Sequence, residues 1–347
     1  MTQLFSSAIL SLALLGGAEA AQTPPPDPEV AKAIEEAHTT TWSDATQVVI
    51  AAHVPGPAMW KLTRGASTLW VLGVLEQTPK DLTWDNRRLR RILKEANVLI
   101  LPGATTVSDA AFRQWDLDSR YHLGDTLSQH ISLGIQYRLE QRLEAEHMDG
   151  TRFSAGLNFV KAARAGANLH VAVRDSHHIL AYQIVKDVQA LPEAASLLSV
   201  TPYTVSDDYL GEGLLHLSRA GDDACLDDYL SDIDWDLNVL PAAAHAWATG
   251  DIATLQKNYR APPGLVCNLL VPQWKQDYET YNIDATAKAL SDELQISGKA
   301  VALVPMGDLL RKGGVLDRLQ AQGVEITSPP SDDMGSPPQL PEPKTQP

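Results

Sequence analysis

Apolar residues follow two different spacings in the first half of this chain. Around Arg64-Gly65-Ala66, the runs MWKLT and STLWVLG alternate apolar and polar positions, which predicts a β-hairpin. Short continuous apolar runs predict buried strands; these cover 47–52, 97–101 and, after the turn-like Gly166, 169–173. Helices are expected from Pro28 to about Ala37, over about 86–96 and over 107–165.

The C-terminal half continues with longer helical segments. Residues 192–259 have the composition of helices joined by acidic loops, and a final unit is expected as strand 300–304, helix 314–321 and strand 324–326. Helix and strand therefore alternate at both ends, with a helical insertion between them. This order predicts an α/β fold, specifically a mixed α+β arrangement with a central mixed sheet flanked by helices.

Both ends of the chain differ in composition from its middle. The apolar run AILSLALL and the pattern Ala18-Glu19-Ala20 predict a signal peptide over 1–20, and the run is too short to span a bilayer. Residues 21–56 are expected to form a linker and a short helix, 57–327 one domain, and the Pro-rich residues 328–347 a disordered tail. We therefore expect a periplasmic or secreted protein with no transmembrane segment after signal cleavage.

The composition of the chain argues against a nucleic-acid partner and against the best-marked enzyme classes. Hydrophobic residues make up 44% of the sequence, enough for a well-buried core, and the formal net charge is −15. Such a negative protein repels phosphate backbones, so we expect no nucleic-acid partner. The sequence contains no HExxH, GxSxG, Walker-type or glycine-rich dinucleotide motif, which removes the best-marked enzyme classes.

Two cysteines, Cys225 and Cys267, follow the predicted signal peptide. In an exported protein they can pair across a loop of about 40 residues, which would contribute ~3 kcal/mol. They can equally be two separate buried thiols, because the sequence does not give the distance between their Cα atoms.

Two other polar patterns suggest chemistry more weakly. The segment from Asp232 to Asn238 has oxygen ligands at alternate positions, as a calcium loop does, but it lacks the glycine and the final glutamate of such a loop. We therefore expect a solvated acidic helix end. His177 and His178 are adjacent and would diverge on any regular element, so we expect a helix start rather than a shared metal ion.

Three groups of residues carry a family resemblance. They are Leu62-Thr63-Arg64-Gly65 with Ser67-Thr68-Leu69 and Leu72-Gly73, then Ala246-Trp247-Ala248-Thr249-Gly250-Asp251, then Val315-Leu316 with Leu319 and Gly323-Val324. Their order and spacing resemble the TraB/GumN family, which includes the Tiki-type metalloproteases. The resemblance covers most of the segment from Pro57 to Ile326. It implies a cleft at the strand ends in which family members hold a divalent metal.

In that family the metal site is implied to consist of two histidines and two glutamates that follow successive strands. The matching positions in this chain are Glu76, Pro102, Arg174 and Asp308, and none carries the family's residue. Proline offers no side-chain donor atom, and the guanidinium of arginine stays protonated and repels a divalent cation. We therefore expect no metal cofactor, with manganese or zinc at a rearranged site as the alternative.

The four positions should still converge, because in the family they are implied to meet around one ion. One hypothesis is that Arg174 takes the structural place of the metal and bridges Glu76 to Asp308. The alternative is that both carboxylates point into solvent while Arg174 pairs elsewhere, for example with Asp175.

The resemblance and the replaced positions together lead to an expected function. We expect an exported, catalytically degenerate member of the family, a pseudoenzyme, that binds a peptide or an envelope protein through the inherited cleft. The alternative is a metal-dependent hydrolase or peptidase with a rearranged site built on Glu76 and Asp308.

Overall fold

The fold is built around one mixed β-sheet. The computed structural model describes residues 27–38, 40–43, 56–120, 126–148, 161–296 and 298–329. Six strands lie in the order β10-β1-β2-β9-β4-β7. Their bounds are β1 Met59–Arg64, β2 Ser67–Val74, β4 Val98–Ile100, β7 Leu198–Val200, β9 Lys299–Pro305 and β10 Glu325–Thr327. Strands β2, β9, β4 and β7 run parallel, while β1 pairs antiparallel with β2 and β10, so the predicted mixed sheet is confirmed.

The predicted hairpin forms the start of this sheet. β1 and β2 pair in register from Met59 opposite Leu72 to Arg64 opposite Ser67, and the turn between them contains Gly65 at φ 59°. β2 then pairs in parallel with β9 as far as Val74, and β9 pairs with β4. The carboxyl ends of these parallel strands therefore meet at one edge of the sheet, which is where α/β proteins place their ligands.

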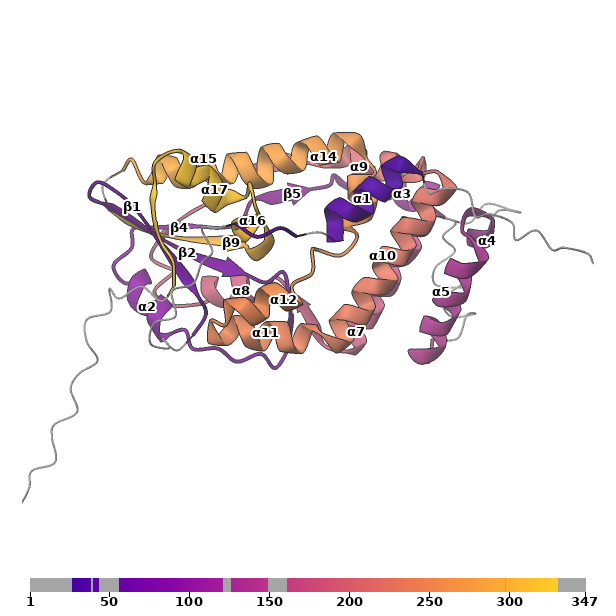
Figure 1. The fold of residues 1–347 in the computed structure, drawn as a ribbon, viewed down its shortest axis with the longest axis horizontal. Helices are drawn as coiled ribbons and strands as arrows, with labels where there is room; N and C mark the ends of the chain where they lie inside the picture. Colours follow the sequence, from indigo (N-terminus) through magenta and orange to yellow (C-terminus); the bar gives the residue numbers. More distant parts are fainter. Residues whose placement is uncertain are drawn as a thin grey trace, which may run out of the picture.

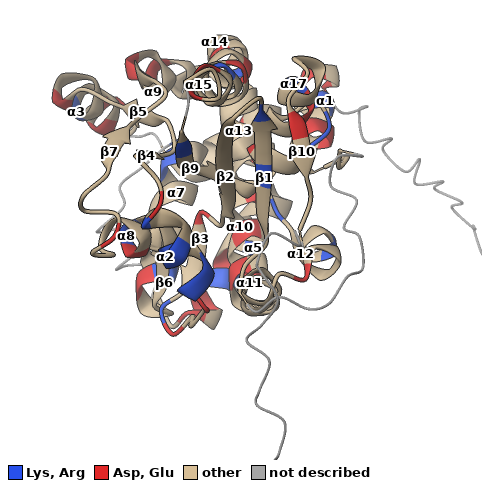
Figure 2. Cartoon of the chain, turned by 90° about the vertical axis from the view of Figure 1, so that its left-hand side faces the viewer, with Lys and Arg blue, Asp and Glu red and all other residues tan. Residues whose placement is uncertain are grey.

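Helices cover both faces of the sheet (Figures 1 and 2). One face carries α2 Arg87–Leu93, α8 Gln183–Gln189, α11 Leu240–Thr249 and α12 Ile252–Asn258. The other carries α14 Pro272–Asp277, a π-helix Tyr278–Ala285, α15 Thr286–Glu293 and α17 Val315–Ala321, while α16 Met306–Leu310 directly follows β9. The main hydrophobic core lies between these layers, with Trp60, Leu62, Leu69 and Leu72 of the hairpin fully buried.

A second, helical part lies beside the carboxyl edge of the sheet (Figure 1). Its central helix is α10 Arg219–Asn238, and the helices around it are α1 Pro28–His38, α3 Asp109–Asp118, α4 Leu127–His130, α5 Leu133–Ala145, α7 Ala162–Ser176, α9 Asp208–Leu215 and α13 Leu265–Leu269. Two short strand pairs, β3 Gln77–Pro79 with β6 Ile179–Ala181 and β5 Ala104–Thr106 with β8 Thr204–Ser206, connect it to the sheet. Smaller hydrophobic clusters separate from the main core hold these helices together.

The expected strand at 169–173 is wrong, because these residues lie inside α7. Gly166, which was interpreted as a turn, is helical; a Cβ there would lie 2.4 Å from Cδ2 of Tyr229 on α10. The glycine therefore allows two helices to approach closely, a requirement that only the tertiary structure imposes. The strand of this region is β6, and His177 and His178 lie between the end of α7 and the start of β6 rather than at a helix start.

The other predicted elements agree with the structure to different degrees. The helix at Pro28, the helix near 86–96, the strand near 97–101 and the C-terminal strand-helix-strand unit are all confirmed. The continuous helix over 107–165 is wrong, since the described residues there form α3, α4 and α5 with breaks between them. The expected strand 47–52, the signal peptide and nearly all of the tail lie outside the described residues. Among described helices, none has the length and apolar character needed to cross a membrane.

The segment Ala246–Asp251 ties the helical layer to the sheet. Trp247 is fully buried, and its indole Nε1 donates a 2.7 Å hydrogen bond to the carbonyl oxygen of Gly73 in β2. Gly250 ends α11 in the left-handed conformation at φ 75°, and the side chain of Asp251 caps α12 by accepting a hydrogen bond from the N–H of Thr254. This motif therefore has a structural role next to the carboxyl edge of β2.

Replacing Trp247 by phenylalanine should cost about 2 kcal/mol of the free energy of unfolding, because it leaves the buried Gly73 carbonyl without a partner and opens space in the core. Urea denaturation followed by circular dichroism measures the loss. The half-buried Trp84, whose ring contacts Trp247 at 5.3 Å, supplies the control: Trp84→Phe should cost distinctly less. Equal costs for both variants would contradict the importance of the Gly73 hydrogen bond.

Candidate functional site

Glu76 and Asp308 lie at the same edge of the central sheet. Glu76 follows the end of β2 by two residues, and Asp308 is the third residue of α16, immediately after β9. These strands are parallel neighbours whose last paired residues are Val74 and Pro305. The two carboxyl groups therefore lie close together at this edge, and the negative charge of Asp308 contributes to the raised pKa of Glu76.

Asp308 is the more enclosed of the two carboxyl groups, with 5% of its surface exposed. Its Oδ1 accepts a short hydrogen bond from the hydroxyl of Tyr278, and the side chain of Asn282 donates a second one. Arg311 adds a favourable positive charge. Burial nevertheless outweighs these contacts and raises the pKa of Asp308 to about 6.

The Glu76 carboxyl has a different environment. No side-chain hydrogen bond to it occurs within the described part of the chain, and no base pairs with it there. Burial, and next the negative charge of Asp308, raise its pKa from 4.5 to about 8. Near neutral pH the pair therefore holds roughly one proton, mainly on Glu76, while Asp308 is mainly ionised.

A π-helix places two of the polar partners of Asp308. Tyr278 is the first residue of this helix and Asn282 the fifth, and its wide turns direct both side chains toward Asp308. π-Helical turns are rare and concentrate at functional sites. The Oδ1 atom of Asn282 also accepts a 2.8 Å hydrogen bond from the hydroxyl of Tyr203, so the network extends across the site.

Pro102 follows β4 at the same sheet edge but offers no polar side-chain atom. Its neighbour Gly103 has a clear role, because a Cβ there would lie 1.9 Å from Cζ of Tyr203. The Tyr203 ring thus occupies the space beside the end of β4. Burial, followed by the charge of Asp308, raises the pKa of Tyr203, so the phenol stays protonated and acts as a hydrogen-bond donor.

The residue that follows the middle strand is Tyr182, not Arg174. β6 ends at Ala181, and Tyr182 adopts the left-handed conformation at φ 53° while its N–H donates a 2.8 Å hydrogen bond to the carbonyl oxygen of Glu76. The charge of Glu76 is the largest cause that raises the pKa of the Tyr182 phenol to about 12. Arg174 lies one helix earlier, near the end of α7.

A cleft of about 240 Å³ opens beside Glu76. Its lining includes Glu76, His170, Arg174, Tyr182 and Tyr229. His170 is held in place by a buried 2.9 Å contact between its Nε2 and Asp236. Arg174 also faces this cleft, and its Nε is buried without a hydrogen-bond partner in the described residues.

The predicted bridge of Arg174 between the two carboxylates is absent. Among the described residues Arg174 forms no ion pair with Glu76, Asp308 or Asp175. The structure therefore brings Glu76 and Arg174 to one cleft without joining them, and it brings Glu76 and Asp308 together without a base between them.

The donor set at this edge does not fit the family's metal. Glu76 and Asp308 supply carboxylate oxygens, but Asp308 already accepts hydrogen bonds from Tyr278 and Asn282. A transition-metal site needs at least three protein ligands. Nowhere in the described ranges do three or more histidine, cysteine, aspartate or glutamate side chains gather in a way that could hold a metal ion.

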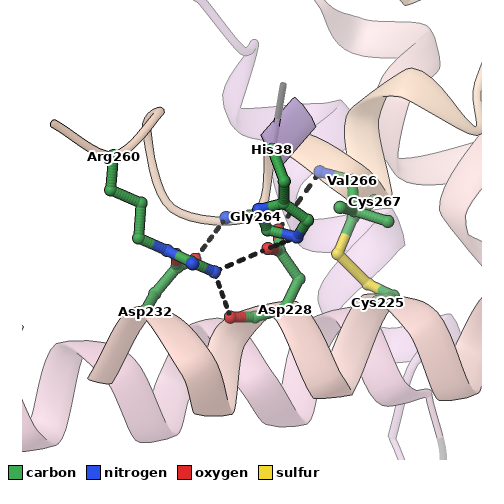
Figure 3. The surroundings of a disulfide bond; sticks show 8 residues. All are labelled: His38, Cys225, Asp228, Asp232, Arg260, Gly264, Val266 and Cys267. Carbon is green, nitrogen blue, oxygen red and sulfur yellow. Dashed lines mark hydrogen bonds and ion pairs between the residues drawn. A yellow bond between two sulfur atoms is a disulfide. The ribbon is translucent and has the colours of Figure 1, made fainter. Parts of the chain in front are cut away.

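The loop Tyr259–Gly264 forms a wall of the site and is fastened to α10 by an arginine clasp (Figure 3). Arg260 pairs with Asp228 at 3.0 Å and with Asp232 more closely. The N–H of Gly264 donates to Asp232 at 3.1 Å. Burial and the charge of Asp228 raise the pKa of Asp232 to about 8 despite Arg260. His38 lies 3.4 Å from Asp228 on the other side, so removing the guanidinium would leave this imidazole as the basic neighbour of the two acids in the described part of the chain.

A disulfide reinforces the same junction. Cys225 on α10 and Cys267 on α13 are bonded, with their Cα atoms 4.7 Å apart (Figure 3). The bond joins the end of the clasped loop to α10 a second time, next to the hydrogen bond from the Val266 N–H to Asp228 at 3.2 Å. The wall of the site is therefore fixed covalently as well as electrostatically.

The expected solvated acidic end over 232–238 is wrong for two of its residues. All three aspartates lie within α10, and Asp232 and Asp236 are buried. Each has a basic partner: Arg260 for Asp232, Arg142 for Asp234 and His170 for Asp236. The alternating oxygens thus satisfy three separate contacts and do not share one ion.

Sequence reasoning missed most of the polar groups around the carboxyl pair. These groups are Tyr182, Tyr203, Tyr259, Tyr278 and Asn282. The tyrosines have no shared spacing, since they come from different connections that meet only at the sheet edge.

Comparison with known proteins places this site in a family context. The model described as the TraB/PrgY/gumN family matches residues 58–328. No curated protein and no solved structure matches the chain.

The raised pKa of Glu76 predicts a specific pH dependence of stability. A carboxyl whose pKa is higher in the folded state contributes stability below pH 4.5, and that contribution is lost as the pH rises to about 8. Glu76→Gln should therefore match the parent protein near pH 4.5 and exceed its free energy of unfolding by several kcal/mol at pH 9, since a pKa that is one unit higher corresponds to about 1.4 kcal/mol. Urea denaturation across this range measures the difference, and Glu144→Gln, at an exposed position of α5, should show none. A difference that does not change with pH would contradict the assignment.

The ion pairs of Arg260 predict a large loss of stability when this arginine is replaced by a neutral residue. Arg260→Met should lower the free energy of unfolding by about 3–5 kcal/mol, because the buried Asp228 and Asp232 would lose the guanidinium that they share, and the remaining basic neighbour, His38, contacts Asp228 at 3.4 Å. The exposed Arg87, which pairs only with its near neighbour Asp85, gives the matched variant Arg87→Met, for which we expect no measurable change. Chemical denaturation compares the two, and a small loss for Arg260→Met would show that the acids are stable as a neutral pair.

Proposed function

This chain belongs to the TraB/PrgY/gumN family, and we propose that it is a non-catalytic, exported binding protein. Its ligand would be a peptide, or an exposed segment of an envelope protein, that enters the cleft beside Glu76. The peptide would present a cationic group to Glu76 and an anionic group to Arg174. Binding would require no resident metal.

The observation that carries this proposal is the unpaired state of Glu76. A carboxyl group at this depth keeps its proton because no cation accompanies it. An ammonium or guanidinium group from a ligand would replace that proton and form the ion pair that the described residues do not provide. Tyr182 and Tyr229 add aromatic rings to the same lining, and such rings favour cations.

Arg174 supports the second half of the proposal. Its guanidinium lines the cleft with Glu76 and has a buried Nε without a partner in the described residues. A carboxylate would satisfy such a donor through a charge-assisted hydrogen bond. A cleft of about 240 Å³ with one acid and one base suits the end of a peptide better than a purely cationic or purely apolar ligand.

Two features favour action outside the cytoplasm. The first residues have the pattern of a signal peptide. The Cys225–Cys267 disulfide is the kind of bond that persists in oxidising compartments. We therefore place the proposed peptide or protein partner in the periplasm or outside the cell.

A hydrolase is the second candidate, and one observation favours it. The pKa values of Asp308 and Glu76, about 6 and about 8, lie on either side of neutrality, as expected for a general base and a general acid. The contacts of Asp308 argue against this role, because Tyr278 and Asn282 already occupy its oxygens. Peptide cleavage, with or without added manganese or zinc, that Asp308→Asn abolishes would favour the hydrolase.

The binding function predicts affinity for a short zwitterionic peptide with linked proton release. Trialanine should bind and release about one proton from Glu76 near pH 7, and its affinity should rise as the pH approaches 8. Isothermal titration calorimetry in buffers of different ionisation enthalpy measures both quantities. N-acetylated and C-amidated trialanine should each bind about tenfold more weakly.

Matched variants identify the two ends of the ligand. Glu76→Gln should remove proton release and the preference for the free amine, while Arg174→Gln should remove the preference for the free carboxylate. Glu144→Gln should change neither. Equal binding of all three peptides, or binding that Glu76→Gln leaves unchanged, would overturn the proposed function.

A further inference from the structure

A second cavity, of about 320 Å³, lies on the other side of the clasped loop. Pro262 of that loop lines both this cavity and the Glu76 cleft. The far wall consists of the end of α1, residues 40–41 and the segment that follows α16. Backbone hydrogen bonds hold this wall together, since Lys312 N–H donates to the carbonyl oxygen of Thr41 at 2.6 Å and Ser43 N–H to that of Leu310 at 2.9 Å.

The charged lining of this cavity is predominantly basic. Arg311 and Lys312 are adjacent and both line it. The one acidic side chain in its lining, Glu36, is already neutralised by Lys275 at 2.5 Å and Lys32 at 3.9 Å. An anion entering the cavity would therefore meet the ammonium group of Lys312 and the guanidinium of Arg311, of which Nη2 is already paired with Glu279.

Neither base is fully used by the described part of the protein. Arg311 donates through Nη2 to Glu279 at 2.6 Å, but its Nε is buried without a hydrogen-bond partner. Lys312 is exposed, and its ammonium group forms no ion pair with any described residue. The hydroxyl groups of Thr40 and Thr41 add two further donors to the same lining.

The rest of the lining is apolar and aromatic. Tyr259 and Tyr278 present their rings, and Leu265 and Pro262 add aliphatic surface. The Arg311 guanidinium lies 5.0 Å from the centre of the Tyr278 ring, a cation–π contact within the lining. The site thus combines a partly buried cation, an exposed cation and an apolar wall.

We propose that this cavity binds a small organic carboxylate, with its anionic group on Arg311 and Lys312 and its apolar part against Tyr259 and Leu265. Arginine and lysine together with hydroxyl donors recognise an oxyanion, and the planar guanidinium suits a carboxylate. The apolar wall distinguishes such a ligand from inorganic phosphate or sulfate. This site is separate from the Glu76 cleft, and the inference does not depend on the function proposed for that cleft.

The protein can be tested with benzoate, benzamide and inorganic phosphate by isothermal titration calorimetry. Benzoate should bind to one site, in the millimolar range or tighter. Benzamide, which has the same shape without the charge, and phosphate, which has charge without an apolar part, should each bind about tenfold more weakly. The affinity for benzoate should also fall with added salt.

Variants of Lys312 and Arg311 test what each cation contributes to benzoate binding. Lys312→Gln changes an exposed side chain and should weaken benzoate about fivefold, and Arg311→Lys, which keeps the charge but loses the planar donor group, should weaken it further. Lys80→Gln, at an exposed lysine outside the cavity lining, should have no effect. Glu76→Gln should also leave benzoate binding intact, which distinguishes this site from the peptide cleft.

Three results would overturn the inference. Equal affinities for benzoate and benzamide would show an apolar pocket without anion recognition. Equal or tighter binding of phosphate would show a general anion site with no role for the apolar wall. Binding of benzoate that neither Lys312→Gln nor Arg311→Lys weakens, or no saturable binding up to about 10 mM, would place no carboxylate in this cavity.

Discussion

The parallel pairing of β2 with β9 determines the position of the two carboxyl groups of the candidate site. Because the two strands are in register up to Val74 and Pro305, the connections that follow them begin at the same level. Glu76 and Asp308 are therefore neighbours although 232 positions separate their numbers (308 − 76). The buried hairpin and the Trp247 hydrogen bond to Gly73 keep β2 at this level, so the site depends on core packing several residues away.

Buried carboxyl groups have two kinds of surroundings in this protein. Some have a basic side chain beside them, and Glu76 has none among the described residues. Asp228 and Asp232 share Arg260, they accept hydrogen bonds from the N–H groups of Val266 and Gly264, and His38 lies 3.4 Å from Asp228. No base in the described ranges pairs with Glu76 in this way. A buried acid that already has a basic partner gains little from a charged ligand. A buried acid without a counter-ion can gain an ion pair from a cationic ligand.

The loop Tyr259–Gly264 relates the two cavities to each other. Pro262 contributes to both, and the Arg260 clasp with the nearby disulfide holds the loop against α10. Tyr278 forms a second connection, because its ring lies under Arg311 while its hydroxyl donates to Asp308. The chain belongs to the TraB/PrgY/gumN family, and at the sheet edge Glu76 and Asp308 lie close enough for the charge of Asp308 to raise the pKa of Glu76.

The sequence by itself determined the elements whose signals are local. Alternation predicted the hairpin, and the C-terminal strand-helix-strand unit followed from short apolar runs. The family resemblance also predicted that Glu76 and Asp308 lie close together. Only the tertiary structure decided that 169–173 is helical. Gly166 lies within the same helix, α7, where the Tyr229 ring of α10 leaves no room for a Cβ atom. The tertiary structure alone also decided that Tyr203, Tyr278 and Asn282 lie around Asp308 and that Arg174 forms no bridge between Glu76 and Asp308. These contacts join distant segments, and their energy comes from burial and from partners that no local spacing encodes.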